Sequence, residues 1–499
     1  MFDSANLDHR IDKKAYQREE PKLREALLNA QFDLKENGRF AVLILIAGVE
    51  GAGKGETVNL LNEWMDPRHI HTYAFPDPSD EESERPPMWR FSRALPPKGT
   101  IGIFFGAWHT QAIVERVQGR ISEGEFSRYI GEILRFEKML CDEGVLLLKY
   151  WFHLSKAQQK ERLHELERDP KTRWRVTDLE WKYAKQYKKF VRVCDPFLRK
   201  TSTGEAPWIV VPGADPHYRS LTVGRHLLAS MRERLDEKPP RHLPDPNPPL
   251  PAPTDSMNVL RALKLDQPMT HDAFRAELEK WQGRLNLLSR HPGFRDLSVV
   301  AVFEGNDAAG KGGAIRRVTQ ALDARSYHNI SVAAPTEEER AQPYLWRFWR
   351  HIPRRGRFII FDRSWYGRVL VERIEGFCSE ADWRRAYGEI NDFEQQLVRN
   401  RMVLVKFWLA IGKDEQLRRF REREKVVFKR FKITQEDWRN RKKWRAYEIA
   451  VCDMVDRTST STTPWTLVEA NNKYHARIKV LKTLCRSIEE GLERAKRRS

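Results

Sequence analysis

A glycine-rich loop occurs twice in this chain, and each time it follows a run of apolar residues. In the second occurrence, Gly305 to Lys311 read GNDAAGK after the apolar run 299–303. In the first, Gly48 to Lys54 read GVEGAGK after the run 41–47. The two lysines are 257 positions apart, since 311 − 54 = 257. The pattern predicts a strand, a tight glycine turn and a helix in each copy.

The same offset relates segments far from the loops. Three short motifs recur at it: Trp-Arg-Phe (from 89 and 346), Val-Glu-Arg (from 114 and 371) and Pro-Trp (from 207 and 464). We infer a tandem duplication, with a first domain over 1–236 and a second over 257–499. Prolines crowd residues 237–256, which excludes helix and sheet interiors, so we predict an extended linker there.

Each copy alternates short apolar runs with longer charged segments. Continuous apolar runs suit strands that are buried on both faces, and hence a mainly parallel sheet. Segments such as 380–400 and 413–423 carry charges at helical spacing. Each domain is therefore expected to be an α/β structure, a parallel sheet sandwiched by helices, with ligands at the carboxyl ends of its strands. The predicted strands are 41–47, 101–105, 145–154 and 208–211 in the first copy, and 299–303, 357–361, 402–411 and 465–469 in the second.

The composition narrows the choice of ligand and compartment. The 499 residues carry a formal net charge of +19, which favours a polyanionic partner but does not tell nucleic acid from a phosphorylated molecule. The five cysteines show no CxxC spacing. The sequence shows neither a secretory signal nor an apolar stretch of roughly 20 residues. We therefore expect a cytoplasmic protein without a membrane contact.

The second loop has the residues of a phosphate-binding site. Glycines allow the tight turn, and backbone N–H groups at the start of the following helix point at phosphate oxygens. Lys311 offers its ammonium group to the phosphoryl group in transfer. The Ser or Thr that usually follows, a magnesium ligand, is a glycine here, and Asp307 is the obvious substitute. We expect phosphate to be bound by Gly305, Asn306, Ala308, Ala309, Gly310, Gly312 and Gly313.

An apolar run that ends in aspartate supplies the second candidate motif, since residues 358–368 read FIIFDRSWYGR. A carboxylate at a strand end suits Mg²⁺, so Asp362 is expected to hold the ion together with Asp307. Arg363 and Arg368 are expected to clamp phosphate oxygens, because a guanidinium forms two parallel hydrogen bonds. The alternative is that Asp362 caps the next helix and that both arginines are ordinary surface residues.

The first copy lacks the chemistry of this second motif. At the fixed offset, Asp362 is replaced by Phe105, and the two arginines are replaced by glycine and glutamine. The loop aspartate is replaced by Glu50, a longer carboxylate. Phenylalanine cannot hold a cation, so we expect catalysis to belong to the second domain. The first domain would be structural, regulatory or substrate-guiding.

A basic segment follows the helix after the third predicted strand in each copy, at 168–175 and at 421–432. In the second copy we expect a mobile lid that closes over phosphates and excludes water. The alternative is a solvated basic helix. The predicted lid residues are Arg421, Arg423, Lys425, Lys429, Arg430 and Lys432.

Together these motifs resemble polyphosphate kinase family 2. The second loop matches the family's G-x-D-x-x-G-K-G-G, and residues 361–368 with Val-Glu-Arg at 371–373 match its F-D-R-S-W-Y-x-R and V-E-R. The family's lid often carries D-P-x-K-R-W-K-like sequence, which residues 169–175 match better than the second copy does. The resemblance covers nearly the whole chain outside the linker and the termini. It implies two tandem P-loop-kinase-like domains, each with a basic helical lid.

The resemblance also implies phosphoryl transfer between inorganic polyphosphate and a nucleotide, with Mg²⁺ as cofactor. Family members with two fused domains convert AMP to ADP, so polyphosphate and AMP or ADP are the expected partners. A homo-oligomer is a further hypothesis. A separate hypothesis is that the fused copies imitate a dimer of single-domain relatives.

Two rival functions stay open. One is an ATP-dependent nucleotide kinase with the same core. The other is a nucleic-acid-binding protein with a relic loop, in which Trp438, Trp444 and Tyr447 would stack bases. Nucleic acid is not the partner we expect.

Overall fold

The computed structural model describes residues 2, 4–7, 9–237, 259–427, 431 and 433–497. The predicted lid residues Lys429, Arg430 and Lys432 lie outside this part of the chain, and so does almost all of the predicted linker. The chain divides into two compact units that follow the sequence copies, except that Ser79–Trp89 groups with the second unit and Thr336–Trp346 with the first. The domain limits at 236 and 257 stay a prediction.

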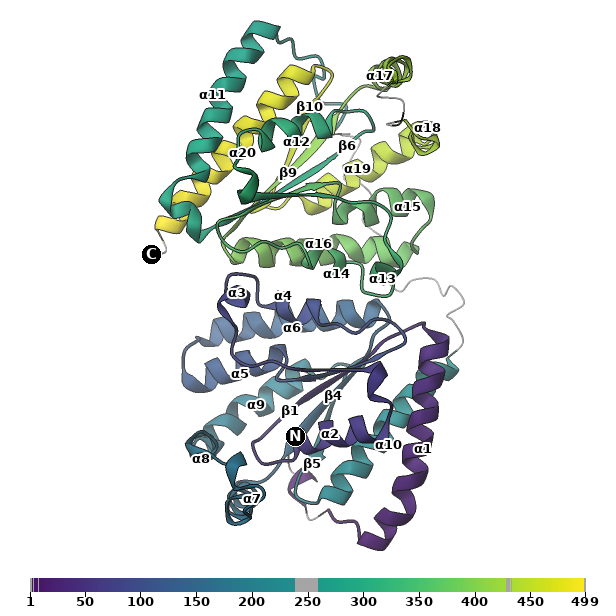
Figure 1. Ribbon diagram of the computed structural model, residues 1–499, viewed down its shortest axis with the longest axis vertical. Helices are drawn as coiled ribbons and strands as arrows, with labels where there is room; N and C mark the ends of the chain where they lie inside the picture. The colour runs from purple at the N-terminus through teal and green to yellow at the C-terminus, as the bar shows by residue number, and fades with distance from the viewer. Residues whose placement is uncertain are drawn as a thin grey trace. The chain divides into compact units, whose positions relative to one another are not determined.

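The first unit is built around five parallel strands in the order β2-β3-β1-β4-β5 (Figure 1). One group of helices packs together on one face of this sheet and comprises α1 (Lys13–Asn37), α2 (Lys54–Trp64) and α10 (Pro216–Asp236). The other face carries α5 (Trp108–Gln118), α6 (Glu123–Asp142) and α9 (Tyr187–Thr201), with α7 (Lys156–Arg168) and α8 (Asp178–Lys185) beyond the strand ends. The strands are β1 (Val42–Gly48), β2 (Ile70–Ala74), β3 (Ile101–Phe105), β4 (Leu146–His153) and β5 (Trp208–Pro212).

The second unit repeats this plan with the order β10-β9-β6-β8-β7, again entirely parallel. One face carries α11 (His271–Ser289), α12 (Lys311–Thr319) and α20 (Lys473–Lys496). The other carries α15 (Val371–Glu375), α16 (Glu380–Arg399) and α19 (Trp444–Thr458), while α17 (Lys413–Lys425) and α18 (Gln435–Lys442) lie beyond the strand ends. The strands are β6 (Ser298–Gly305), β7 (Tyr327–Ser331), β8 (Phe358–Asp362), β9 (Met402–Ala410) and β10 (Trp465–Glu469).

The structure confirms the predicted α/β class, the parallel sheets and all eight predicted strands, with ends that shift by two residues at most. The apolar runs form strands that are buried on both faces, as predicted. Every residue of β9 is buried, and so is every residue of β6 except the last. The edge strands β2 and β7 were not predicted. Their sequences, IHTYA and YHNIS, are mostly exposed and carry no apolar run.

One buried charge fixes the segment that follows β8. Lys406 in β9 is fully buried and forms an ion pair with Glu394 of α16 at 2.8 Å. Glu394 in turn accepts hydrogen bonds from Trp365 Nε1 (3.1 Å) and from the Tyr366 hydroxyl (2.6 Å). Removing one partner would leave a buried charge uncompensated, at a cost of about 3–5 kcal/mol. The turn after β8 is therefore rigidly held against the sheet.

Among the described residues, none of the helices combines the length and the hydropathy needed to cross a bilayer.

Candidate active site

The second glycine loop has a backbone that only glycine permits at its start. Gly305 has a φ of +151°, and a Cβ built there would lie 2.5 Å from the carbonyl oxygen of Leu409. Gly310, with a φ of +107°, precedes the first turn of α12. Lys311 curls back and donates from Nζ to the Gly305 carbonyl at 2.8 Å. Among the described residues it pairs with no carboxylate, so its charge is free to meet phosphate.

A buried arginine clamps the loop to the end of the sheet. Arg419 of α17 is 2% exposed and donates to the carbonyls of Ala308 (2.9 Å) and Ala309 (3.0 Å). Its Nη2 donates to the carbonyl of Ala470, just beyond β10, at 2.6 Å. This residue was not among the predicted site residues. The signal was present, because Arg162 stands at the same offset in the first copy.

Asp307 is held in place by three neighbours. Its Oδ1 accepts from Arg363 Nη2 at 3.4 Å, and its Oδ2 accepts from Asn440 Nδ2 at 3.0 Å. Its backbone carbonyl accepts from Gln416 Nε2 at 3.1 Å. The loop carboxylate is thus positioned beside a guanidinium at the end of β8. Neither Asn440 nor Gln416 was predicted.

The two sequence motifs meet because β8 pairs with β6. The register sets Asp362 opposite Phe303, two residues before the glycine loop. Arg363 follows with a φ of +65°, and its N–H donates to the Phe303 carbonyl at 3.0 Å. Burial lowers the pKa of the Arg363 guanidinium, but the carboxylates of Asp307, Glu304, Glu436 and Asp362 outweigh this and raise that pKa overall. Arg363 therefore stays charged within a cluster of acids.

Glu304 is an acid that the sequence analysis overlooked. It ends the buried part of β6, is 5% exposed, and accepts a hydrogen bond from the Ser364 hydroxyl at 2.8 Å. Burial raises the pKa of its carboxyl group, against the opposing effect of Lys311. The sequence signal for Glu304 was an acidic residue at the end of an apolar run. At the same offset, the first copy has alanine.

The acids fit a magnesium ion that takes most of its ligands from elsewhere. The described residues contain no group of three or more His, Cys, Asp or Glu placed to hold a metal. No described residue donates a hydrogen bond to the carboxylate of Asp362. Mg²⁺ is commonly bound by one or two carboxylates with waters and substrate phosphates completing its shell. Asp307 and Asp362 remain the predicted pair of this kind.

A pocket of about 70 Å³ opens on one side of the loop. Its polar groups include Asp307, Arg363 and Asn440, and its apolar wall includes Val371, Trp444 and Tyr447. Two of the three aromatic residues invoked for base stacking on nucleic acid thus line this small pocket.

The third of those aromatic residues, Trp438, packs edge-on against Phe420 with the ring centroids 5.1 Å apart. The three rings therefore do not form the open stacking platform that the nucleic-acid rival requires.

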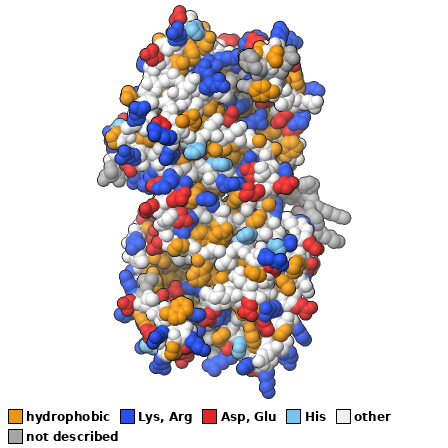
Figure 2. Space-filling view, viewed as in Figure 1, with side chains coloured by type: hydrophobic (Ala, Val, Ile, Leu, Met, Phe, Trp, Pro, Cys, Tyr) orange, Lys and Arg blue, Asp and Glu red, His pale blue; other side chains and the backbone are white. Residues whose placement is uncertain are grey.

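A basic groove of about 490 Å³ lies on the other side of the loop. It runs along Ala308, Ala309 and Gly310 and between α12, α17 and α20, where Figure 2 shows Lys and Arg side chains gathered. Burial lowers the pKa of the Lys473 ammonium, and the nearby Arg419 lowers it further. Burial also lowers the pKa of Arg477, with Arg317 adding to the effect. Like charges held together in this way create a strong site for an anion. The cationic lining residues are Arg419, Arg423, Lys425, Lys473 and Arg477.

Among the predicted site residues that the structure describes, six line neither cavity: Lys311, Gly312, Gly313, Asp362, Arg368 and Arg421. Arg368 forms an ion pair with Glu372 at 2.9 Å, and its clamping role stays a prediction. Of the predicted lid, Arg421, Arg423 and Lys425 belong to the last turns of α17. Arg423 and Lys425 line the basic groove, and Arg421 does not.

A family model and two curated relatives match nearly the whole length of this chain. A family model described as Polyphosphate kinase 2 matches residues 10–239 and 268–496, one stretch in each copy. The chain is 59% identical, over 99% of its length and 100% of the relative, to a Pseudomonas aeruginosa protein named Polyphosphate:AMP phosphotransferase. It is 38% identical to an Acinetobacter johnsonii protein of the same name, over 93% and 94% of the two chains.

A solved structure is equally similar. The crystal structure of a putative polyphosphate kinase 2 from Pseudomonas aeruginosa has a TM-score of 0.90 to this chain at 57% identity, covering 99% of this chain and 100% of that one. With the paired loops, the strand-end acid and the basic groove in place, the conclusion is that this chain belongs to the polyphosphate kinase 2 family.

Proposed function

We propose that this protein transfers a phosphoryl group from inorganic polyphosphate to AMP, forming ADP, in its second domain. One observation carries the proposal: the glycine loop separates two different cavities. Residues 305–307 line the small pocket with aromatic walls, and residues 308–310 line the basic groove. A nucleotide suits the first cavity and a phosphate polymer the second, with the loop at the junction. The names of the relatives support this assignment.

The groove supplies the charge that a polymer needs. Arg423, Lys473 and Arg477 come from two different helices and line one continuous cavity. A chain with a negative charge on every unit can bind several of these cations at once, which a single phosphate cannot. Lys311 begins α12 beside the groove, where its ammonium would neutralise charge on the phosphoryl group in transfer.

In this proposal, the small pocket binds and orients the acceptor nucleotide. Arg363 is oriented by Asp307 and can hold the acceptor phosphate, while Trp444 and Tyr447 offer ring faces to the base. The acceptor is already an anionic phosphate, so no general base is needed. Alignment and charge neutralisation do most of the work. Asp307 and Asp362 would hold Mg²⁺, which when bound neutralises phosphate charge.

The test is an end-point assay with AMP and Mg²⁺, in which either long-chain polyphosphate or ATP is the donor. We expect ADP to form with polyphosphate, and chelation of the metal to stop it. Asp362→Asn should lower kcat/KM by roughly two orders of magnitude or more, as expected when an essential charge-stabilising group is lost. Turnover with ATP and none with polyphosphate would favour the ATP-dependent rival instead.

A further inference from the structure

The first domain has a pocket of about 200 Å³ at the carboxyl ends of its strands. It lies where the small pocket lies in the second domain, because the lining residues correspond at the offset of 257. Trp151 corresponds to Trp408, and Tyr187 corresponds to Trp444. The pocket in the second domain measures about 70 Å³. The copy without the strand-end acid has thus kept a cavity at this position, and the cavity is larger.

This pocket has lost the charges that would hold a phosphate. Phe105 and Gly106 stand where the second domain has its strand-end acid and the adjacent arginine. The loop lysine, Lys54, is neutralised within the domain, since its Nζ donates to Glu50 Oε1 at 2.9 Å and to the Gly48 carbonyl at 3.0 Å. A phosphate would have to displace Glu50 from this pair.

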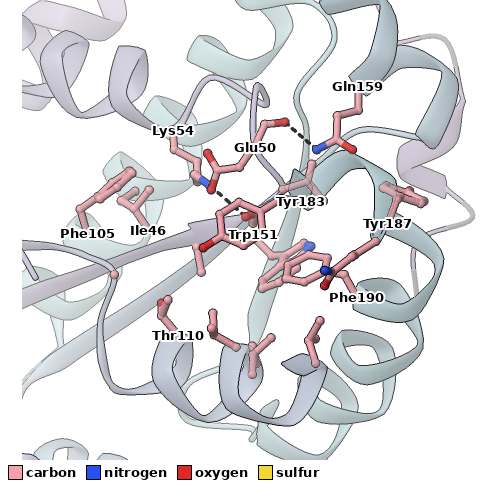
Figure 3. Close-up of a pocket in the computed structure, with 18 of the residues that line it drawn as sticks. Ile46, Glu50, Lys54, Phe105, Thr110, Trp151, Gln159, Tyr183, Tyr187 and Phe190 are labelled. Carbon is pink, nitrogen blue, oxygen red and sulfur yellow. Dashed lines mark hydrogen bonds and ion pairs between the residues drawn. The ribbon is translucent and has the colours of Figure 1, made fainter. Parts of the chain in front are cut away.

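The walls of the pocket suit a flat ring. Figure 3 shows Tyr187 and Phe190 on one side and Phe105 with Ile46 on the other. Trp151 forms part of the floor and stacks on Phe190 with the ring centroids 5.9 Å apart. Aromatic side chains bind planar rings by stacking and by edge-to-face contact.

Polar side chains that line the pocket could form hydrogen bonds with the edge of such a ring. The side chains of Thr110, Gln118 and Gln186 line the pocket and form no hydrogen bond with any described residue. Amide and hydroxyl groups both donate and accept, which suits the mixed edge of a nucleobase. Glu50 is 40% exposed, and only its Oε1 is engaged by Lys54. Its second oxygen can accept from ribose hydroxyl groups, as acids do in dinucleotide sites.

We propose that the pocket of the first domain binds a nucleoside without its phosphate. The base lies among the aromatic side chains, and the ribose hydroxyls bind Glu50. The site does not react, since it has neither the acid pair nor a free loop lysine. This inference rests on the proposed function in one respect only, that the corresponding pocket of the second domain is a nucleotide site.

The test is calorimetry with adenosine and with AMP on the full-length chain carrying Val371→Phe. That change fills the small pocket of the second domain, so the remaining binding reports the first. We expect one adenosine per chain, and an affinity for AMP at least roughly tenfold weaker, a difference of about 1.4 kcal/mol. Adding the matched change Val114→Phe in the first-domain pocket should weaken adenosine binding at least tenfold. Both valines line their pockets at the same offset.

Three results would overturn the proposal: no adenosine binding, loss of adenosine binding through Val371→Phe alone, or equal affinity for AMP and adenosine. If the thermal transition shows that Val114→Phe disturbs folding, Tyr183→Ala replaces it, because that ring is 36% exposed and contributes little to the core.

ADP formation from AMP is measured in the same variants. Val114→Phe should keep it, and Val371→Phe should lose it. If even the unaltered chain formed no ADP, the proposed function would fail, while the calorimetry would still decide whether the first-domain pocket binds a nucleoside.

Discussion

The two copies share a sheet and a loop but differ in where their carboxylates lie. In the second copy, the only described hydrogen-bond acceptor of Lys311 Nζ is the Gly305 carbonyl, and Asp307 pairs with Arg363. In the first, Glu50 takes the position of Asp307 and pairs with its own loop lysine at 2.9 Å. One extra methylene lets the carboxylate reach the ammonium group. The first copy keeps the loop, but Glu50 of the same loop neutralises the charge of Lys54.

A second carboxylate fills the phosphate side of the first copy. Glu56 pairs with Arg219 at 2.6 Å, with Arg162 at 3.1 Å and with Arg175 at 3.5 Å. The second copy has Gly313 at this position, and a Cβ there would lie 3.3 Å from Arg477. An internal anion thus occupies the place where, in the second copy, we propose that phosphate binds. Under the proposed function, the difference teaches that internal anions can silence a duplicated site, as can the loss of catalytic groups.

Among changes to these internal carboxylates, the largest effect should come from placing one in the second copy. Gly313→Glu would place a carboxylate beside Arg477 in the basic groove. We expect KM for polyphosphate to rise roughly tenfold or more, because each 1.4 kcal/mol of lost binding is a factor of ten. Steady-state kinetics at fixed AMP measures this. The neutral control Gly313→Gln should stay near the unaltered value, and an equal rise in both would point to steric blocking.

Removing the internal carboxylate from the first copy should lower stability and leave activity unchanged. Glu56→Gln leaves Arg219, which is 3% exposed, without its charged partner. We expect the free energy of unfolding to fall by about 1–3 kcal/mol, at the lower end because Glu56 itself is one-third exposed. Denaturant unfolding measures the change. ADP formation should be unaltered, and its loss would show that the first copy takes part in the reaction.

A smaller expected effect is a pH dependence of stability that comes from a buried histidine present only in the first copy. His153 in β4 is 1% exposed, and burial lowers its pKa to about 4, whereas the second copy has Ala410 at this place. The unfolded chain titrates this group near pH 6.5, so the folded state binds fewer protons between pH 6.5 and 4. Its contribution to stability is therefore complete above pH 6.5 and is lost as the pH falls, by at most about 1.4 kcal/mol per unit.

His153→Gln removes the titrating group and keeps a donor for Asn6, which His153 contacts at 3.1 Å. Unfolding at pH 7 and pH 5 should show a smaller loss of stability for this variant than for the unaltered chain. An identical loss in both would mean that other groups set the acid sensitivity.

The sequence predicted the features that depend on local pattern. The apolar runs predicted the buried strands, and the spacing of Gly305, Gly310 and Lys311 predicted the loop. The edge strands β2 and β7 were missed, because exposed strands need no apolar run. Arg419 and Asn440 were missed for another reason. They contact the loop from 110 or more positions away in the sequence, and only Arg419 had a sequence signal, the arginine at the same offset in the first copy.

The central claim is that only the second copy transfers phosphate, and paired lysine variants test it most directly. Lys311→Ala and Lys54→Ala remove the same group from the two loops, and each is compared by kcat/KM for AMP with polyphosphate as donor. We expect Lys311→Ala to lose roughly two orders of magnitude or more, and Lys54→Ala to stay within about threefold of the unaltered chain. Equal losses from the two changes would contradict the account.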